Sequence, residues 1–181
     1  MAASFDAGDE ALLLHATRSS STAQRATAQQ RIFEVFRARV LALCFHVLGD
    51  RDEAEDAVQD TFVSVFGGLA HSRGEARLST WIYQITLREA LRHKGRRRVT
   101  EQLDDTIAAP ALGDPAIRRE QHDRLARALD RLSSDHRIVL SLFALEGLSH
   151  REIADVLQVP EGTIWSRLHG ARKRLASELA S

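Results

Sequence analysis

The 181-residue chain has little cysteine, little proline, few aromatic residues and no long apolar run. Its only cysteine, Cys44, excludes an internal disulfide, and we interpret it as a core residue rather than a redox sensor. No apolar run approaches the roughly 20 residues of a membrane span, and the opening MAASFDAGDE lacks the pattern of a secretion signal. We therefore expect a cytoplasmic protein without membrane insertion.

The chain also has a net charge of zero, because its 25 basic and 25 acidic residues cancel. Unaided binding to a DNA duplex usually needs a surplus of Lys and Arg, which displace counterions from the phosphates. The chain therefore either does not bind DNA or segregates its charges along the sequence. A hydrophobic content of 44% is enough for a packed core and argues against global disorder.

Prolines are scarce, and the three present, Pro110, Pro115 and Pro160, all lie at expected element boundaries. Helical periodicity dominates, and no convincing run of alternating strand residues occurs. Gly49 is suited to end the first long helix, and Ser79 is suited to cap the helix that follows it in the chain. The pattern predicts helices over residues 9–18, 28–48, 52–69, 79–94, 116–132, 135–146, 150–157 and 160–179.

These helices predict an all-α fold of two small helical domains joined by a flexible linker, the second carrying a helix-turn-helix. Residues 1–26 form a partly flexible N-terminal segment, in which the polar run SSSTAQRATAQQ begins and is expected to be weakly structured. The first domain covers 27–98 and the second 116–181. Between them, residues 99–115 mix acids, Pro and Gly without a clear period, as linkers do. The expected core stripe of the first long helix is Ile32, Phe36, Val40, Leu43 and Val47.

The helix at 52–69 has an acidic face. An advance of 100° per residue gathers Ala54, Val58, Phe62, Val65 and Leu69 on a core face. The opposite face collects Asp52, Glu53, Asp56, Asp60 and the apolar Val63. Acids near a helix N-terminus are favoured by the helix dipole, so an ordinary solvated face explains the charges. An apolar side chain among carboxylates favours instead a docking surface for a protein.

The helix at 79–94 has the opposite charge. Its apolar stripe of Leu78, Trp81, Ile82 and Ile85 gives way to a basic run in which Glu89 is the only acid. Aromatic rings beside a cationic track suit single-stranded nucleic acid, since bases stack while phosphates are neutralised. Trp81 and Tyr83 lie next to this track, although Trp81 is also suited to the core and a basic run can simply aid solubility. The run contains Arg88, Arg92, Lys94, Arg96, Arg97 and Arg98.

Residues 147–164 predict a helix-turn-helix. Ser149 and Glu152 have the spacing of a capping box, and Ile153, Ala154 and Leu157 form the apolar side of a short helix. Pro160 suits the first position of the next helix. A short helix, a tight turn and a second helix with an Ile/Leu core make this pattern more specific than an incidental helical hairpin.

The last helix, EGTIWSRLHGARKRL, is suited to lie on DNA. Its core stripe is Ile164, Leu168, Ala171 and Leu175, and its opposite side holds Gly162, Ser166, His169 and Lys173, with Gly170 alongside. Arg167 and Arg174 occupy one flank, and Arg172 and Trp165 the other. We predict that the arginines contact phosphates while Ser166 and His169 meet base edges. Trp165 either packs on the flank or contacts thymine methyl groups, and Gly170 lets the backbone approach closely.

Three segments together resemble one family: LGDRDEAEDAVQDTFVSVF, STWIYQIT followed by RRR, and LEGLSHREIADVLQVPEGTIWSRLHGARKRL. In order and spacing they are similar to the extracytoplasmic-function (ECF, group 4) sigma factors of the bacterial sigma-70 family. With the first long helix, the resemblance covers about 30–98 and 118–178. Arg88 stands where the family often has Asn, and Trp165 and Gly170 stand where Lys or Arg is common, so the promoter sequence does not follow from the resemblance.

The resemblance implies a sigma factor that binds core RNA polymerase and directs promoter-specific transcription initiation. The residues implied for polymerase binding are Asp52, Glu53, Asp56, Gln59, Asp60 and Val63. Those implied for recognition and melting of the minus-ten element are Thr80, Trp81, Tyr83, Arg88, Arg92, Lys94, Arg96, Arg97 and Arg98. Those implied for the minus-thirty-five element are Thr163, Trp165, Ser166, Arg167, His169, Arg172, Lys173 and Arg174.

The implied partners are core RNA polymerase, promoter DNA and an anti-sigma factor. No catalytic residue, metal, cofactor or small-molecule substrate is expected. A stand-alone helix-turn-helix regulator is the alternative, but it leaves the acidic helix and the arginine run unexplained and predicts a dimer on palindromic DNA. A nucleic-acid enzyme with a helix-turn-helix tail fits less well, because no acidic triad or nucleophile constellation occurs.

Overall fold

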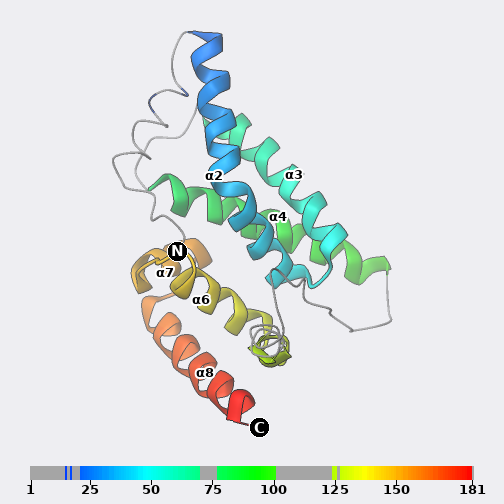
Figure 1. Cartoon of the computed structure of the whole chain (residues 1–181), viewed down its shortest axis with the longest axis vertical. Coiled ribbons are helices and arrows are strands. Elements are labelled where there is room, and N and C mark those ends of the chain that lie inside the picture. Colours follow the sequence, from blue (N-terminus) through cyan, green and yellow to red (C-terminus); the bar gives the residue numbers. More distant parts are fainter. Residues whose placement is uncertain are drawn as a thin grey trace. The chain divides into compact units, whose positions relative to one another are not determined.

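The computed structural model describes residues 15, 17, 21–69, 77–100, 124–125 and 127–180, and these residues contain helices and no strand. They form two compact units, which are treated separately below (Figure 1). The first unit holds α2 (Thr22–Leu48), α3 (Arg51–Gly68) and α4 (Leu78–Thr100). The second holds α6 (Ser134–Ala144), α8 (Glu161–Ala180) and the greater part of α7 (His150–Leu157). The predicted all-α fold is confirmed.

Helix α2 is longer than predicted. It begins at Thr22 rather than at residue 28, after Ser21, whose hydroxyl accepts a hydrogen bond from the Gln24 amide at 3.4 Å. The expectation that this polar run is weakly structured was therefore wrong from Thr22 onward, because Ala, Gln and Arg are good helix formers once a serine caps them. The predicted end is confirmed: Gly49 has a φ of 75°, and its amide donates to the Phe45 carbonyl.

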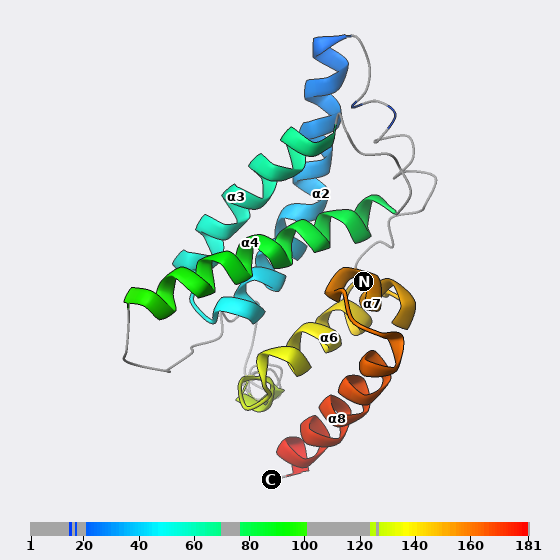
Figure 2. The ribbon, with the colours of Figure 1, turned by 180° about the vertical axis from the view of Figure 1, so that it is seen from behind.

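The three helices of the first unit all contact one another, and α4 crosses α2 (Figure 2). Both predicted core stripes are confirmed, since every member is buried, from Ile32 to Val47 in α2 and from Ala54 to Leu69 along α3. Cys44 is fully buried among them. Burial raises the pKa of its thiol to about 12, so the thiol is protonated at neutral pH and is a poor nucleophile.

Helix α4 differs from its prediction at both ends. It begins at Leu78, so Ser79 lies inside the first turn rather than at the cap position. It continues to Thr100 instead of ending at residue 94, and it therefore includes the whole arginine run and the first two residues of the predicted linker. Arginine and lysine favour helices, and the single Gly95 costs only about 1 kcal/mol, too little to end one.

Helices α7 and α8 form the predicted helix-turn-helix. The capping box at the start of α7 is confirmed: the Ser149 amide donates to the Glu152 carboxylate at 2.8 Å, and the Glu152 amide donates to the Ser149 hydroxyl at 3.2 Å. Helix α8 begins at Glu161, one residue later than predicted, so Pro160 immediately precedes it instead of occupying its first position. Ile153, Ile164 and Leu168 are buried, as the apolar pattern indicated, whereas Leu157 and Leu175 are only half-buried.

Two predicted helices lie mostly outside the described residues. Of the helix expected at 9–18, residues 15 and 17 are described and are helical. Of the helix expected at 116–132, residues 124–125 and 127–132 are described, and they are helical as far as residue 130, two residues short of the predicted end. Residues 101–115 of the predicted linker are not described.

Candidate nucleic-acid interface

The acidic face of α3 is exposed along most of its length. Asp52, Asp56 and Gln59 are exposed, and Glu53 is half-buried. Val63 leaves 73% of its surface in solvent, the largest exposed fraction among the large apolar residues of the described chain. The face therefore combines carboxylates with an apolar side chain that the unit itself does not cover, as its sequence indicated.

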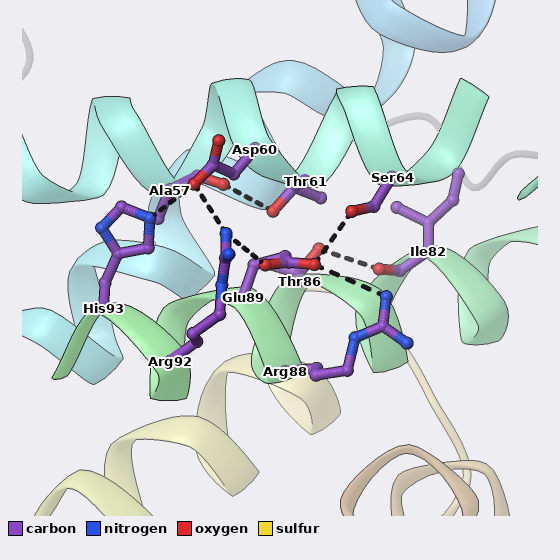
Figure 3. Close-up of polar contacts among 10 residues, drawn as sticks. All are labelled: Ala57, Asp60, Thr61, Ser64, Ile82, Thr86, Arg88, Glu89, Arg92 and His93. Atoms are coloured by element: carbon purple, nitrogen blue, oxygen red, sulfur yellow. Dashed lines mark hydrogen bonds and ion pairs between the residues drawn. The ribbon is translucent and has the colours of Figure 1, made fainter. Parts of the chain in front are cut away.

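Asp60, which was grouped with this face, is engaged by α4 instead (Figure 3). Its Oδ2 lies 2.8 Å from His93 Nε2 and accepts a hydrogen bond from Arg92 Nη2, also at 2.8 Å. The hydrogen bond with His93, reinforced by the charge of Arg92, lowers the pKa of the Asp60 carboxyl below its ordinary 3.8. Asp60 is therefore an ion-pair partner that joins α3 to α4, and its carboxylate is not free on the surface.

Glu89, the one acid of the basic run, is buried, and sequence reasoning assigned it no role. Its Oε1 accepts a hydrogen bond from the Ser64 hydroxyl of α3 at 2.9 Å (Figure 3). Its two oxygens also pair with the flanking arginines, with Arg92 Nη2 at 2.8 Å and Arg88 Nη2 at 3.5 Å. The sequence signal was present, since an acid with arginines at i−1 and i+3 is able to pair with both.

The exposed face of α4 is cationic with one apolar member. Arg88, Leu91, Arg92 and Arg96 lie three to four residues apart, so they share one side of the helix, and all four are exposed. Lys94 differs from the prediction, because its ammonium group donates to the Val47 carbonyl at 3.1 Å and so satisfies the end of α2. The helix backbone includes Arg97 and Arg98, but their side chains lie outside the described part of the chain.

The predicted aromatic surface beside this track is not formed in the structure. Tyr83 is only 1% exposed, and its ring packs edge-on against Phe36 with centroids 6.2 Å apart, so it is a core residue. Thr80 is also buried. Trp81 is half-buried and packs so closely on Gly68 that a Cβ there would lie 3.0 Å from the indole. The inward-facing helical positions of these residues explain the correction, and Leu91 is the apolar residue that faces outward.

One arginine of α8 serves the fold of the second unit. Arg167 pairs with Asp135 of α6 at 2.7 Å, and only 29% of its side chain is exposed. Gly170 also faces α6, since a Cβ there would lie 3.2 Å from His136 Nε2. The expectation that Gly170 lies alongside the DNA-facing residues is therefore wrong, because the close approach it permits is to the imidazole of His136.

The opposite flank of α8 carries an aromatic stack. Trp165 lies on the His150 ring with centroids 4.0 Å apart and planes 10° from parallel, and His150 in turn contacts Phe143. The Arg172 guanidinium lies 4.8 Å from the centroid of Phe143. Trp165 still leaves 59% of its surface exposed. It therefore both packs on the flank and offers an apolar surface to solvent.

The remaining predicted DNA-facing residues of α8 are open to solvent. Ser166, His169 and Lys173 are exposed, and Thr163 is half-buried. The Ser166 hydroxyl donates to the Thr163 carbonyl at 2.9 Å, which leaves its oxygen able to accept a hydrogen bond. Arg174 pairs with Glu178 one turn later at 3.2 Å and keeps 61% of its side chain exposed.

Within the described residues, no group of three or more His, Cys, Asp or Glu side chains is placed to hold a metal ion. No helix of the described chain is long and apolar enough to cross a membrane.

Two family models match most of this architecture. Residues 32–100 match the model described as Sigma-70 region 2, which spans α3, α4 and most of α2. Residues 122–175 match the model described as Sigma-70, region 4, which contains the helix-turn-helix.

Named relatives agree with these matches. The chain is 30% identical over 158 residues to the RNA polymerase sigma-H factor of Pseudomonas aeruginosa, covering 80% of this chain and 82% of that protein. It is 33% identical over 150 residues to the ECF RNA polymerase sigma factor SigE of Mycolicibacterium smegmatis, covering 78% of this chain and 58% of that protein. A co-crystal structure of the sigma factor RpoE with the anti-sigma factor NepR from Bartonella quintana is similar with a TM-score of 0.67 at 26% identity, covering 83% of this chain and 95% of that one.

Proposed function

Because the chain belongs to the ECF group of the sigma-70 family, we propose that it directs promoter-specific initiation by binding core RNA polymerase and the minus-ten and minus-thirty-five elements. The observation that carries this proposal is the separation of charge within the first unit. An exposed acidic face with Val63 lies on α3, and an exposed arginine face lies on α4. A chain of zero net charge thereby offers one surface to a basic protein and another to phosphates.

The polymerase-binding surface consists of Asp52, Asp56, Gln59 and Val63. These residues recur at three- and four-residue spacing on α3, so they form one stripe along the helix. Glu53 and Asp60 lie at its margins, and Asp60 gives the stripe less charge than its sequence suggests because Arg92 and His93 already pair with it. A basic partner with an apolar contact for Val63 matches this surface.

The minus-ten surface is the exposed face of α4. Arg88, Arg92 and Arg96 supply charge for the phosphates of an opened strand, and Leu91, at 57% exposure, supplies an apolar contact for a base. Trp81 contributes through the part of its side chain that remains accessible. Tyr83, Thr80 and Lys94 support this face from the core and from the end of α2.

The minus-thirty-five surface is the exposed side of α8. Ser166 and His169 meet base edges in the major groove, while Lys173 and Arg174 contact phosphates. Trp165, held by its stack on His150, faces the groove with its free side. Arg172 lies on the same flank and reaches the backbone over the ring of Phe143.

The proposal includes an anti-sigma partner. The similar RpoE was solved in complex with the anti-sigma factor NepR. The same exposed acidic and apolar stripe on α3 that suits polymerase would then be available to a competitor. We expect transcription that depends on this protein to be absent in cells until the gene of the anti-sigma partner is deleted.

Reconstituted transcription tests the proposed function. Purified core polymerase, fragmented genomic DNA and this protein are combined, and transcript starts are mapped by sequencing. We expect start sites that depend on the added protein and share two conserved elements upstream. A set of starts that is the same with and without the protein contradicts the proposal.

A further inference from the structure

Glu89 is a buried carboxylate inside a face that is otherwise built to attract phosphates. Its side chain is only 8% exposed, and burying a charge is costly unless partners compensate it. Three partners do so: Ser64 of α3 and the arginines on either side, Arg88 and Arg92. All three contacts are made by the carboxylate oxygens, so the group connects the core to two exposed side chains (Figure 3).

The arginines that pair with Glu89 remain available for a further ligand. Arg92 contacts Glu89 and Asp60 through the same nitrogen, Nη2, at 2.8 Å each. A guanidinium group has five N–H donors, so Nε and Nη1 keep three donors for other acceptors. The side chain of Arg92 is 45% exposed and that of Arg88 is 67% exposed. Each guanidinium group is therefore bound through one nitrogen, Nη2, while its other nitrogens remain available to donate hydrogen bonds.

The fold itself has little need of this carboxylate. An apolar residue at position 89 would pack between α3 and α4 without any desolvation cost, and such replacements of buried ion pairs are often neutral or stabilising. A negative charge beneath a phosphate-binding face also weakens the attraction to DNA. A second contribution of the carboxylate to DNA binding would offset this repulsion. Fixing the direction of two long side chains is such a contribution, because it removes the entropy that each would lose on contact.

We infer that Glu89 is a positioning residue, whose buried carboxylate orients the guanidinium groups of Arg88 and Arg92 toward the phosphates of the opened minus-ten strand. The inference rests on the function proposed above. It assigns Ser64 a supporting part, since its hydroxyl fixes the carboxylate from α3.

Two substitutions in the full chain separate positioning from the other effects of Glu89. Glu89→Gln keeps the shape and the acceptor for Ser64 but removes the charge, and Glu89→Leu removes every polar contact. Each variant is assembled with core polymerase, and binding of a fluorescent single-stranded oligonucleotide with the mapped minus-ten sequence is measured by anisotropy. We expect about a tenfold weaker binding for Glu89→Gln, the size typical of coupling within one ion-pair network. Urea denaturation is expected to show no loss of stability for Glu89→Leu.

The sign of the change is decisive, because both variants make the chain more positive. If the carboxylate merely repels the strand or occupies the arginines, binding becomes tighter, and the inference is overturned. It is also overturned if binding falls only in variants whose unfolding midpoint falls as well. Failure of the wild-type holoenzyme to bind the strand contradicts the proposed function instead.

A double-mutant cycle gives a second, independent readout. In a chain that carries Arg88→Ala and Arg92→Ala, the further change Glu89→Gln is expected to leave strand binding unchanged, since the groups that it orients are gone. An equal loss in both backgrounds contradicts positioning. Glu34→Gln, which removes an exposed acid of α2, is the matched control for net charge and is expected to leave strand binding unchanged.

Discussion

At the scale of single residues, the partner of a basic side chain decides what it does. Arg92 and Arg88 are exposed yet anchored by Glu89, Lys94 donates to the end of α2, and Arg167 pairs with Asp135. In the sequence, all four are basic residues on helices expected to bind DNA. Arg88 and Arg92 keep 67% and 45% of their side chains exposed, whereas Arg167 keeps 29%. The number of basic residues in a sequence therefore overstates the charge that is offered to DNA.

The Asp60 contact predicts a dependence of stability on acid. Its pKa is lowered in the folded chain, so its contribution is fully present above the ordinary value of 3.8 and is lost as pH falls through the lower folded value. Asp60→Asn is expected to reduce stability above about pH 4 by less than about 1 kcal/mol, because the pair is partly exposed. The difference between wild type and variant should then shrink in more acidic buffer. Urea denaturation at a series of pH values measures it, and a difference that grows toward low pH contradicts the assignment.

Arg167 and Lys173 are two basic residues of α8 whose substitutions are compared. Arg167→Ala breaks the ion pair with Asp135 and is expected to cost up to about 1 kcal/mol of stability. Lys173→Ala removes an exposed ammonium group and is expected to change stability by less than about 0.5 kcal/mol while weakening DNA binding. Thermal unfolding and promoter binding with polymerase are measured for both. A larger loss of stability for Lys173→Ala than for Arg167→Ala contradicts this division of roles.

At the scale of helices, the packing of α3 against α4 sets the geometry of both proposed surfaces. Asp60 and Glu89 join the two helices through ion pairs and the Ser64 hydrogen bond, while Trp81 packs its ring on Gly68 near the end of α3. The polar contacts and the aromatic contact lie at successive points along the same helix pair. A change at Asp60 or Gly68 is therefore expected to affect the angle at which α4 presents its arginines.

Gly67 and Gly68 test the aromatic contact. A Cβ at Gly67 meets nothing within 4 Å, whereas one at Gly68 lies 3.0 Å from the Trp81 ring. Gly67→Ala is expected to stabilise the chain by about 0.5–1 kcal/mol through helix propensity. Gly68→Ala is expected to forfeit this gain and destabilise by about 1 kcal/mol, because the ring must move. Urea denaturation followed by tryptophan fluorescence distinguishes them, and equal stabilisation by both changes contradicts the packing.

Asp56 tests the acidic stripe without disturbing the helix pair. Asp56→Lys reverses a charge on an exposed position and is expected to lower affinity for core polymerase at least about tenfold, with stability within about 0.5 kcal/mol of wild type. Asp60→Lys is expected to lower both, since it also breaks the contacts with Arg92 and His93. Glu34→Lys on α2 is the charge-matched control. Unchanged polymerase affinity for Asp56→Lys removes the stripe from the interface.

The helices and their buried stripes could be predicted from the sequence because apolar periodicity is local. The pairing of Asp60 with Arg92 could not, since 32 residues separate them and only the packing of α3 on α4 brings them together. The same reason hid the burial of Tyr83 and the contact of Gly170 with His136. The early start of α2 was missed for another reason: its first turns lack a stripe of large apolar residues, so propensity and the Ser21 cap were the only signals.

At the scale of the whole molecule, zero net charge is the property that the proposed function has to explain. The 25 acidic and 25 basic residues of the chain cancel, although acidic residues gather on α3 and basic residues on α4. The free protein therefore lacks the excess of positive charge that drives unaided DNA binding. Docking on polymerase supplies what the charge does not. It fixes the chain and raises the effective concentration of its DNA-binding helices at the promoter.

The affinity of the protein for a promoter duplex, measured with and without core polymerase at physiological salt, tests this account most directly. Fluorescence anisotropy on a promoter mapped by the transcription assay gives both values, with a scrambled duplex as control. The isolated protein is expected to bind both duplexes alike, with a Kd of about 1 μM or weaker. With polymerase, nanomolar binding that is specific to the promoter is expected. Nanomolar, promoter-specific binding by the isolated protein would contradict the account.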